Sequence, residues 1–333
     1  MSLNIILQQM GVICILVSIG IYMQKKKIVD GLTSKKLSAI VVDICNPALI
    51  MASILSGNIT ATHQDLLIAA GLGAAFYALL ILLGFIIPRI LRVQPDKRRF
   101  YNLMTVYTNT GFLGLPVAKA VLPANAILYV IVINVFYSLL FYTHGLTVLG
   151  NGSDAVADSA ETSPEALSDP NKTFSHKVHH NPLLSILNPG TIMALLSLVV
   201  FWYKIELPPI LANTIEYVGN ATVFLSMALL GVSIARSHLE ESIRDIRIWG
   251  YILLRMILVP VGIVLFMTHM SFSPTATLAL CLMAAVPVGN LPMIQAEKIG
   301  ADTKILSSAI AVSTAVSMIT ITVLMSVFTS LLL

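Results

Sequence analysis

Charged side chains are scarce in this sequence of 333 residues, where Asp, Glu, Lys and Arg together make up 11% of the chain. A soluble domain carries about 25% of such residues. Hydrophobic residues instead account for 57%. Most of the surface must therefore face lipid or another helix, which excludes an ordinary soluble domain. The composition predicts an all-α protein that crosses a membrane many times.

Cysteine is also scarce. Cys14, Cys45 and Cys281 lie in apolar segments and show neither CxxC nor Cys/His spacing. This pattern excludes a disulfide framework and a structural zinc site, and it predicts three small buried side chains.

Apolar runs of about 20 residues, separated by charged residues or by Pro and Gly, predict ten transmembrane helices. The second, fourth and ninth runs carry Asn, Gly or Pro in the middle, which is unusual for a simple lipid-facing helix. We place the ten helices at residues 4–23, 37–56, 65–88, 98–122, 124–149, 183–203, 209–234, 247–268, 275–297 and 304–328.

Lys and Arg residues are concentrated in alternate loops. Of the twenty in the chain, all but Lys119, Lys204 and the intramembrane Arg255 fall in one set of loops. Cytoplasmic loops carry an excess of Lys and Arg. The bias predicts a plasma (inner) membrane protein with both termini outside and with residues 150–182 in the cytosol.

Residues 150–182 are the one long stretch of soluble character, acidic and rich in small residues at first. This composition is typical of a flexible linker. His176, His179 and His180 near its end either bind a metal or belong to the solvated linker, and we favour the linker. We therefore predict no metal, no cofactor and no nucleic-acid partner.

The linker separates a first half (1–149) from a second half (183–333), each with five predicted helices. Because five is odd, the second half must enter the membrane from the opposite side, as in the inverted repeats of secondary transporters. A shift of 174 residues along the chain pairs Asn46 with Asn220, and a shift of 176 residues pairs Pro116 with Pro292.

The fourth and ninth apolar runs are predicted to be broken helices, with the break near mid-membrane. Gly and Pro disfavour a continuous helix, and irregular backbone at this depth must line a cavity or be buried in protein. The N-terminal ends of half-helices attract anions such as a carboxylate. The alternative is a pair of ordinary kinks filled by neighbouring side chains, but corresponding positions in both halves favour a binding site. Its candidate residues are Asn109, Thr110, Gly111, Gly114, Pro116, Gly289, Asn290 and Pro292.

The stretch from Asn109 to Pro116 resembles the fourth-helix crossover of the auxin efflux carrier family. The stretch from Pro287 to Pro292, followed by Ala296 and Lys298, resembles the ninth-helix crossover of that family, and Asn46-Pro47-Ala48-Leu49 resembles its second-helix signature. The correspondence spans nearly the whole chain, with a short loop as in bacterial members.

This resemblance implies two inverted five-helix repeats, similar to the fold of bile-acid symporters and Na⁺/H⁺ antiporters. It implies a scaffold of helices 1, 2, 6 and 7 and a moving part of helices 3–5 and 8–10, often in a homodimer. It also implies elevator-like transport of a small organic anion, such as malate, malonate or an auxin-like carboxylate. Asn109 and Asn290 would meet the carboxylate, with Asn46 and Asn220 beside them.

Ionisable residues inside a membrane are functional candidates by default. Asp43 either couples transport to protons or caps the break at Asn46, and Glu216 is its loose counterpart. Arg255 either extends to the headgroups or attracts an anion or pairs helices. Lys119 either faces the substrate or lies at a helix end. Without a cluster of acidic residues, H⁺ coupling is favoured over Na⁺ coupling.

Three other functions compete with a carrier. A receptor or sensor would bind a small carboxylate without moving it, and a channel would also use a polar pore. An intramembrane enzyme would need catalytic groups, but no HExxH or GxSxG motif occurs and amides catalyse poorly. We therefore predict a transporter rather than an enzyme.

Overall fold

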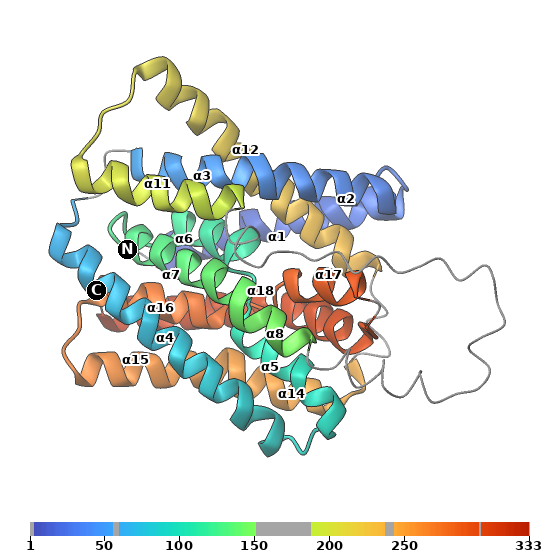
Figure 1. Cartoon of the computed structure of the whole chain (residues 1–333). Helices are drawn as coiled ribbons and strands as arrows, with labels where there is room; N and C mark the ends of the chain where they lie inside the picture. The colour runs from blue at the N-terminus through green and yellow to red at the C-terminus, as the bar shows by residue number, and fades with distance from the viewer. Residues whose placement is uncertain (1–2, 56–59, 151–187, 237–242, 300, 333) are drawn as a thin grey trace.

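The computed structural model describes residues 3–55, 60–150, 188–236, 243–299 and 301–332. Among these residues the chain is helical, apart from turns, connecting segments and one isolated β-bridge between Thr108 and Val288. Figure 1 shows the helices gathered side by side in one bundle. The prediction of an all-α protein is confirmed.

Each of the ten predicted ranges contains helix. The elements in chain order are α1 (Leu3–Lys25), α2 (Gly31–Ile40), η1 (Val41–Cys45), α3 (Asn46–Leu55), α4 (His63–Ile90), η2 (Pro95–Lys97), α5 (Arg98–Val106), η3 (Thr110–Gly114), α6 (Leu115–Val121), α7 (Ala126–Leu140), η4 (Phe141–Gly145), α8 (Leu146–Gly150), α11 (Pro189–Tyr203), α12 (Pro209–Arg236), α14 (Ile246–Ile252), η6 (Leu253–Leu258), α15 (Val259–His269), α16 (Pro274–Ala285), α17 (Leu291–Lys298) and α18 (Lys304–Leu332).

Seven helical segments in the described residues are long and apolar enough to cross a membrane. Three shorter apolar segments, Thr110–Val121, Pro189–Tyr203 and Pro274–Ala285, belong to the predicted fourth, sixth and ninth helices. The protein is therefore a multi-pass membrane protein. The first part of the predicted sixth helix, 183–187, lies outside the described residues.

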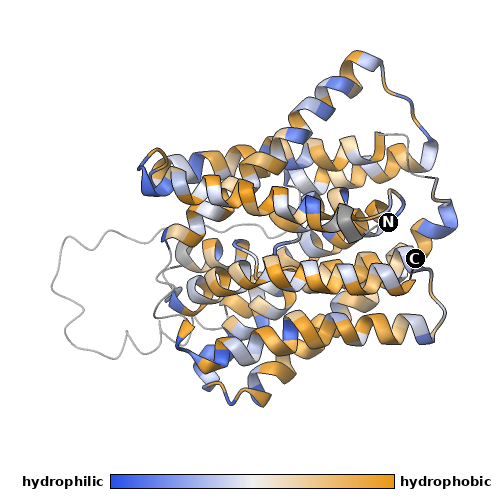
Figure 2. Cartoon of the chain, turned by 180° about the vertical axis from the view of Figure 1, so that it is seen from behind, coloured by the Kyte–Doolittle hydropathy of each residue, from blue (hydrophilic) through white to orange (hydrophobic). Residues whose placement is uncertain are grey.

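Large apolar side chains cover much of the outside of the bundle. Ile15, Leu82, Leu265 and Ile319 are each more than half exposed. Figure 2 shows hydrophobic residues along the lengths of the helices, with hydrophilic ones gathered mostly towards the ends. Monomeric soluble proteins rarely expose apolar patches on this scale, so this surface is suited to lipid.

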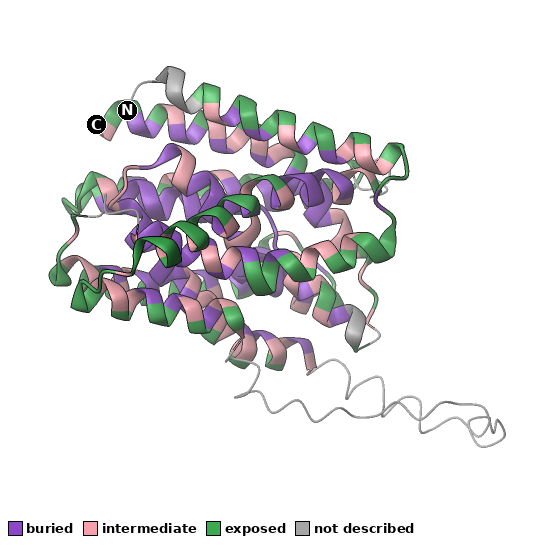
Figure 3. Cartoon of the chain, turned by 90° about the horizontal axis from the view of Figure 1, so that it is seen from above, coloured by how far each residue is buried: buried purple, intermediate pink, exposed green. Residues whose placement is uncertain are grey.

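The helices pack as two sets with a buried centre. In one set α1 and α3 pack on α12, and α11 packs on α3; in the other α4 packs on α5 and α7, and α16 packs on α15 and α18. Figure 1 shows α3, α11 and α12 on one side, α4 and α15 on the other, and α6, α7, α16 and α18 between them. Every residue of α16 from Ala276 to Ala285 is buried, and Figure 3 shows the buried residues gathered in the middle of the bundle.

Two glycines allow α1 and α12 to approach backbone to backbone. A Cβ at Gly20 would lie 2.0 Å from the Ala228 carbonyl oxygen, and a Cβ at Gly231 would lie 2.0 Å from the Val17 carbonyl oxygen. Small residues are the usual means of close helix packing in membranes. This contact joins the first helix to the second half of the chain.

Within the described residues, η1, η3, η4 and η6 are π-helical. Three of them carry an ionisable residue inside a long apolar span: Asp43, His144 and Arg255. Such wide turns occur frequently at functional sites. They therefore mark positions that the apolar pattern alone does not single out.

Two predictions are wrong in detail. The second helix does not break at Asn46 and Pro47, since α2, η1 and α3 follow one another without a gap. Pro47 has no N–H to donate, and the wide π turn η1 directly before it allows the helix to continue. Cys14 is exposed on α1 rather than buried, since it lies on an outer face of the bundle; Cys45 and Cys281 are buried, and all three are free thiols.

Candidate substrate site at the crossing of two broken helices

The fourth and ninth helices both break, and their broken segments cross. The helix α5 ends at Val106 and α16 ends at Ala285, and Thr108 and Val288 then form an antiparallel β-bridge. The Asn109 N–H donates to the Pro287 carbonyl at 2.8 Å, and the Gly289 N–H donates to the Tyr107 carbonyl at 3.1 Å. The two breaks thus satisfy part of each other's backbone, as burial in a membrane demands.

Gly289 is required for this close approach. A Cβ at this position would lie 2.9 Å from the carbonyl oxygens of both Tyr107 and Thr108. The neighbouring Val288 N–H donates to Ser313 Oγ of α18 at 3.2 Å. The crossing is therefore a fixed three-part contact between the two breaks and α18.

Several polar side-chain atoms at the crossing are buried without a hydrogen-bond partner among the described residues. Asn109 is 4% exposed, and its Oδ1 accepts from the Phe112 N–H at 3.2 Å, which caps the start of η3. Among the described residues, Asn109 Nδ2, Thr110 Oγ1, Asn290 Oδ1 and Asn46 Oδ1 have no hydrogen-bond partner. An unsatisfied buried polar group costs about 1–3 kcal/mol, so these atoms are suited to a polar ligand or water.

Other predicted site residues frame this region. A Cβ at Gly111 would lie 3.2 Å from Asn46 Nδ2, so the second helix reaches the crossing, and a Cβ at Gly114 would lie 3.0 Å from Met283 Cε. Pro116 and Pro292 are buried near the starts of α6 and α17, the two helices that follow the breaks.

Arg255 is fully buried next to the crossing and does not reach the surface of the bundle. It has 0% of its surface exposed. Its Nε donates to the Thr105 carbonyl at 2.9 Å, and its Nη1 donates to the Ala284 carbonyl. Arg255 therefore joins the last turns of α5 and α16, and headgroup contact does not explain its presence.

Two tyrosines that the sequence did not single out complete this arrangement. Tyr251, one turn before Arg255, donates through its hydroxyl to the Met104 carbonyl at 2.7 Å. The hydroxyl of Tyr107, at the break itself, lies 2.8 Å from the Leu140 carbonyl oxygen and 2.9 Å from His144 Nδ1. Tyr and His within apolar helices have no motif, so only their presence in apolar spans could have drawn attention to them.

Lys119 and Asn220 meet on α6, the helix that follows the first break, and on α12. Lys119 Nζ on α6 donates to Asn220 Oδ1 on α12 at 3.2 Å. Glu216, one turn earlier on α12, is exposed and interacts electrostatically with Lys119. The structure therefore brings Lys119, Asn220 and Glu216 together, but at the contact between α6 and α12.

Asp43 lies one turn before Asn46. Its side chain is exposed on η1, where it interacts electrostatically with Tyr142 of η4. Asp43 and Glu216 thus occupy different surroundings, and their loose correspondence in sequence is not matched by a shared site.

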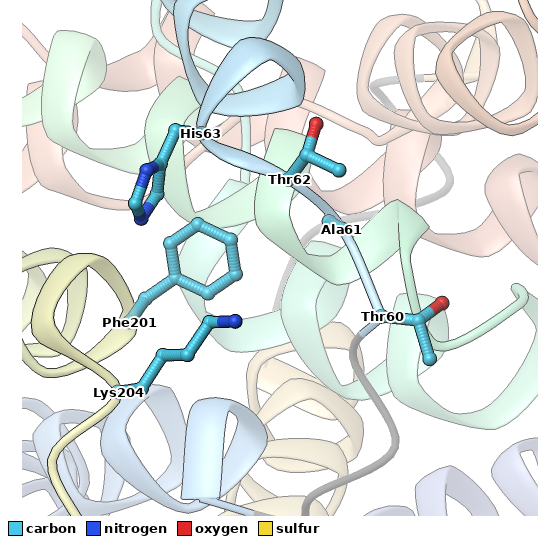
Figure 4. Close-up of a pocket in the computed structure, with 6 residues that line it drawn as sticks. All are labelled: Thr60, Ala61, Thr62, His63, Phe201 and Lys204. Atoms are coloured by element: carbon cyan, nitrogen blue, oxygen red, sulfur yellow. The ribbon is translucent and has the colours of Figure 1, made fainter.

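A separate cavity of about 220 Å³ lies where α4 begins and α11 ends, lined by Thr60, Ala61, Thr62, His63, Phe201 and Lys204. Figure 4 shows the His63 and Phe201 rings and the Lys204 side chain along one side of it. The His63 ring stacks on Trp202 with centroids 4.2 Å apart. None of the predicted site residues lines this cavity.

The described residues contain no group of three or more His, Cys, Asp or Glu side chains placed to hold a metal ion. The predicted choice between a metal site and a linker at His176, His179 and His180 lies outside the described residues.

A bundle of apolar helices in which two broken helices cross, with polar groups buried at the crossing, defines the class of membrane transporters. Residues 5–325 match the family described as "Membrane transport protein", and the chain therefore belongs to that family. The predicted resemblance to auxin efflux carriers is confirmed. The family is one of transporters, not of enzymes.

A relative of similar length agrees with this assignment. The chain is 24% identical over 323 residues to an uncharacterized transporter of Methanocaldococcus jannaschii, a match that covers 93% of this chain and 94% of the archaeal protein. The protein is therefore a multi-pass membrane transport protein.

Proposed function

We propose that the protein is a secondary active transporter that moves a small organic anion across the plasma membrane by alternating access. Malate, malonate or an auxin-like carboxylate is the substrate class. The observation that carries the proposal is the crossing of the two broken helices, where Asn109 and Asn290 flank a backbone bridge and where two donors, Asn109 Nδ2 and Thr110 Oγ1, have no hydrogen-bond partner among the described residues.

The electrostatics of the half-helices favour an anion on one side of this bridge. Helices that begin at Thr110 and Leu291 direct their N-terminal, partially positive ends toward the crossing. The opposite, partially negative C-terminal ends are those of α5 and α16. There Arg255 and Tyr251 donate hydrogen bonds to backbone carbonyl groups. A carboxylate at Asn109 and Asn290 therefore meets helix N-termini and a nearby fixed positive charge.

The packing suggests which parts move. We assign α1, α2, α3, α11 and α12 to the scaffold, and the helices of residues 63–150 and 246–332 to the transport part. The whole consists of ten spans in two inverted repeats (1–149 and 183–333), with both termini outside and residues 150–182 in the cytosol. Elevator-like movement of the transport part, in a homodimer, would carry the crossing from one side to the other.

A receptor, sensor or channel that binds a carboxylate is the competing function. The broken helices favour a carrier over both, because paired breaks in corresponding positions are the arrangement by which alternating-access carriers hold their substrate at mid-membrane.

Uptake into proteoliposomes separates these functions. Purified protein is reconstituted, and uptake of labelled malate, malonate and indole-3-acetate is measured with and without a proton gradient against protein-free liposomes. We expect saturable, gradient-sensitive uptake of at least one of these acids. Binding without flux would establish a receptor, and flux that does not saturate would establish a channel.

A further inference from the structure

The last turns of α5 and α16 converge on one side chain. The last four carbonyl groups of any helix lack partners within that helix. In α5 the Leu103 carbonyl accepts from the Tyr107 N–H, the Met104 carbonyl from Tyr251 and the Thr105 carbonyl from Arg255. In α16 the Ala284 carbonyl accepts from the same guanidinium.

Carriers with broken helices commonly place a coupling cation at such a point. The C-terminal ends of half-helices and the carbonyls of unwound segments coordinate the Na⁺ or H⁺ that drives transport. In this protein a guanidinium is the positive charge between the two C-terminal ends. Arginine stays protonated in proteins, so this charge is permanent.

In the described part of the chain the titratable neighbours of Arg255 are Tyr251 and Tyr77, and no carboxylate is among them. A buried charge is costly unless it is paired or well hydrogen-bonded. The negative ends of the two helix dipoles and the two accepting carbonyls are its counter-charge. One donor group, Nη2, has no hydrogen-bond partner among the described residues.

We propose that Arg255 takes the place of a bound coupling cation, so that the carrier needs no Na⁺ to assemble its crossing or to bind its anionic substrate. Arg255 is a positioning residue: it ties α5 to α16 and gives the crossing a fixed positive charge. The flux measurements that test this inference rest on the proposed transport function. The melting measurements with added cations do not.

The residue also fixes which helices move together. Tyr251 of α14 and Arg255 of η6 both donate to carbonyl groups of α5, and Arg255 also donates to one of α16. The eighth helix must therefore move with the crossing rather than past it.

The first test removes the guanidinium and returns it as a free ion. Arg255→Ala is compared with the wild-type protein and with Arg247→Ala, an exposed arginine at the start of the same helix. Thermal unfolding is measured in detergent with choline, Na⁺ or guanidinium chloride at millimolar concentration, far below denaturing levels. We expect guanidinium to raise the melting temperature of Arg255→Ala alone, and no ion to raise that of the wild type or of Arg247→Ala.

The second test measures flux of labelled malonate, or of whichever acid the wild type moves. We expect wild-type flux to be unchanged when choline replaces Na⁺ on both sides. Arg255→Ala should lose about tenfold or more, as expected when a charged hydrogen-bond donor is removed, with recovery in guanidinium. If Arg255→Ala does not fold, Arg255→Lys, which keeps the charge and loses the second donor arm, takes its place and should retain Na⁺-independent flux at a reduced rate.

The two tests separate failure of this inference from failure of the transport proposal. A wild-type protein that needs Na⁺, or an Arg255→Ala variant that behaves as wild type in melting and flux, overturns the role of Arg255. If no acid is transported by the wild type, the proposed function fails, while the melting experiment still decides whether a cation fits where Arg255 lies.

Discussion

Asn109 donates its backbone N–H to the carbonyl of Pro287 at 2.8 Å, although the two residues come from opposite halves of the chain. Each residue lies just after the end of a membrane helix. The backbone N–H groups of each break donate to carbonyl groups of the other break. Because backbone groups hold the bridge between the two breaks, the Asn109 and Asn290 side chains are not needed for it, and Asn109 Nδ2 has no hydrogen-bond partner among the described residues. This division of roles underlies the first two predictions.

The amides of Asn109 and Asn290 are expected to bind the substrate. Replacing either by Ala should lower transport about tenfold or more, because hydrogen bonds to a charged group are worth about 1.5–3 kcal/mol. The melting temperature should change little for Asn290→Ala, whereas Asn109→Ala also loses the cap on the Phe112 N–H, which is worth about 0.5–2 kcal/mol. Uptake into proteoliposomes, with thermal unfolding of the same preparations, is the measurement.

Asn134→Ala is the matched control, since this half-buried amide donates to the Val130 carbonyl of its own helix at 2.9 Å. Its transport should match that of the wild type. Normal kinetics in both crossing variants would show that these amides do not contact the substrate.

Gly289 is expected to tolerate no side chain. Gly289→Ala places a Cβ against two backbone oxygens that cannot turn aside, 2.9 Å away. We expect a loss of stability of about 1–3 kcal/mol, the usual cost of overpacking, together with loss of transport.

Gly262→Ala provides the comparison, because a Cβ at this glycine of α15 meets nothing within 4 Å. There the change should stabilise the helix by about 0.5–1 kcal/mol. Equal melting temperatures for the two variants would mean that the bridge is not as close as the structure places it.

The hydrogen bond between Lys119 and Asn220 joins α6 of the proposed moving part to α12 of the proposed scaffold. Such a contact must break when the parts move, so removing it should speed exchange of labelled substrate across the membrane. Lys119→Met, Asn220→Ala and the double variant should have the same effect, because residues that act through one contact are not additive.

Lys204→Met serves as a control, since Lys204 is exposed whereas Lys119 is half-buried. Additive effects of Lys119→Met and Asn220→Ala would show that the two residues act separately. A raised KM for Lys119→Met alone would instead place Lys119 in contact with the anion.

The positions of the helices could be predicted from the apolar runs, and the breaks in the fourth and ninth helices could be predicted from Gly and Pro within those runs. The π turns could not, because a wide turn such as η1 or η6 has no residue signature. For Arg255 the sequence left headgroup contact, anion attraction and helix pairing open, because its bonds to Thr105 and Ala284 depend on how three distant helices pack. The same holds for the Lys119–Asn220 contact, which joins the two halves of the chain.

Asp43 is the carboxylate whose place inside a π turn makes it a candidate for proton coupling. Replacement by Asn removes the proton that a carboxylate can release, so flux should lose part of its dependence on pH and on an imposed proton gradient. Uptake is measured across a series of pH values, with Asp96→Asn as the control, since Asp96 is exposed in the short η2 segment. An unchanged pH profile in Asp43→Asn would remove this residue from the coupling mechanism. His144, which lies 2.9 Å from the Tyr107 hydroxyl at the crossing, would then be tested by His144→Gln in the same assay.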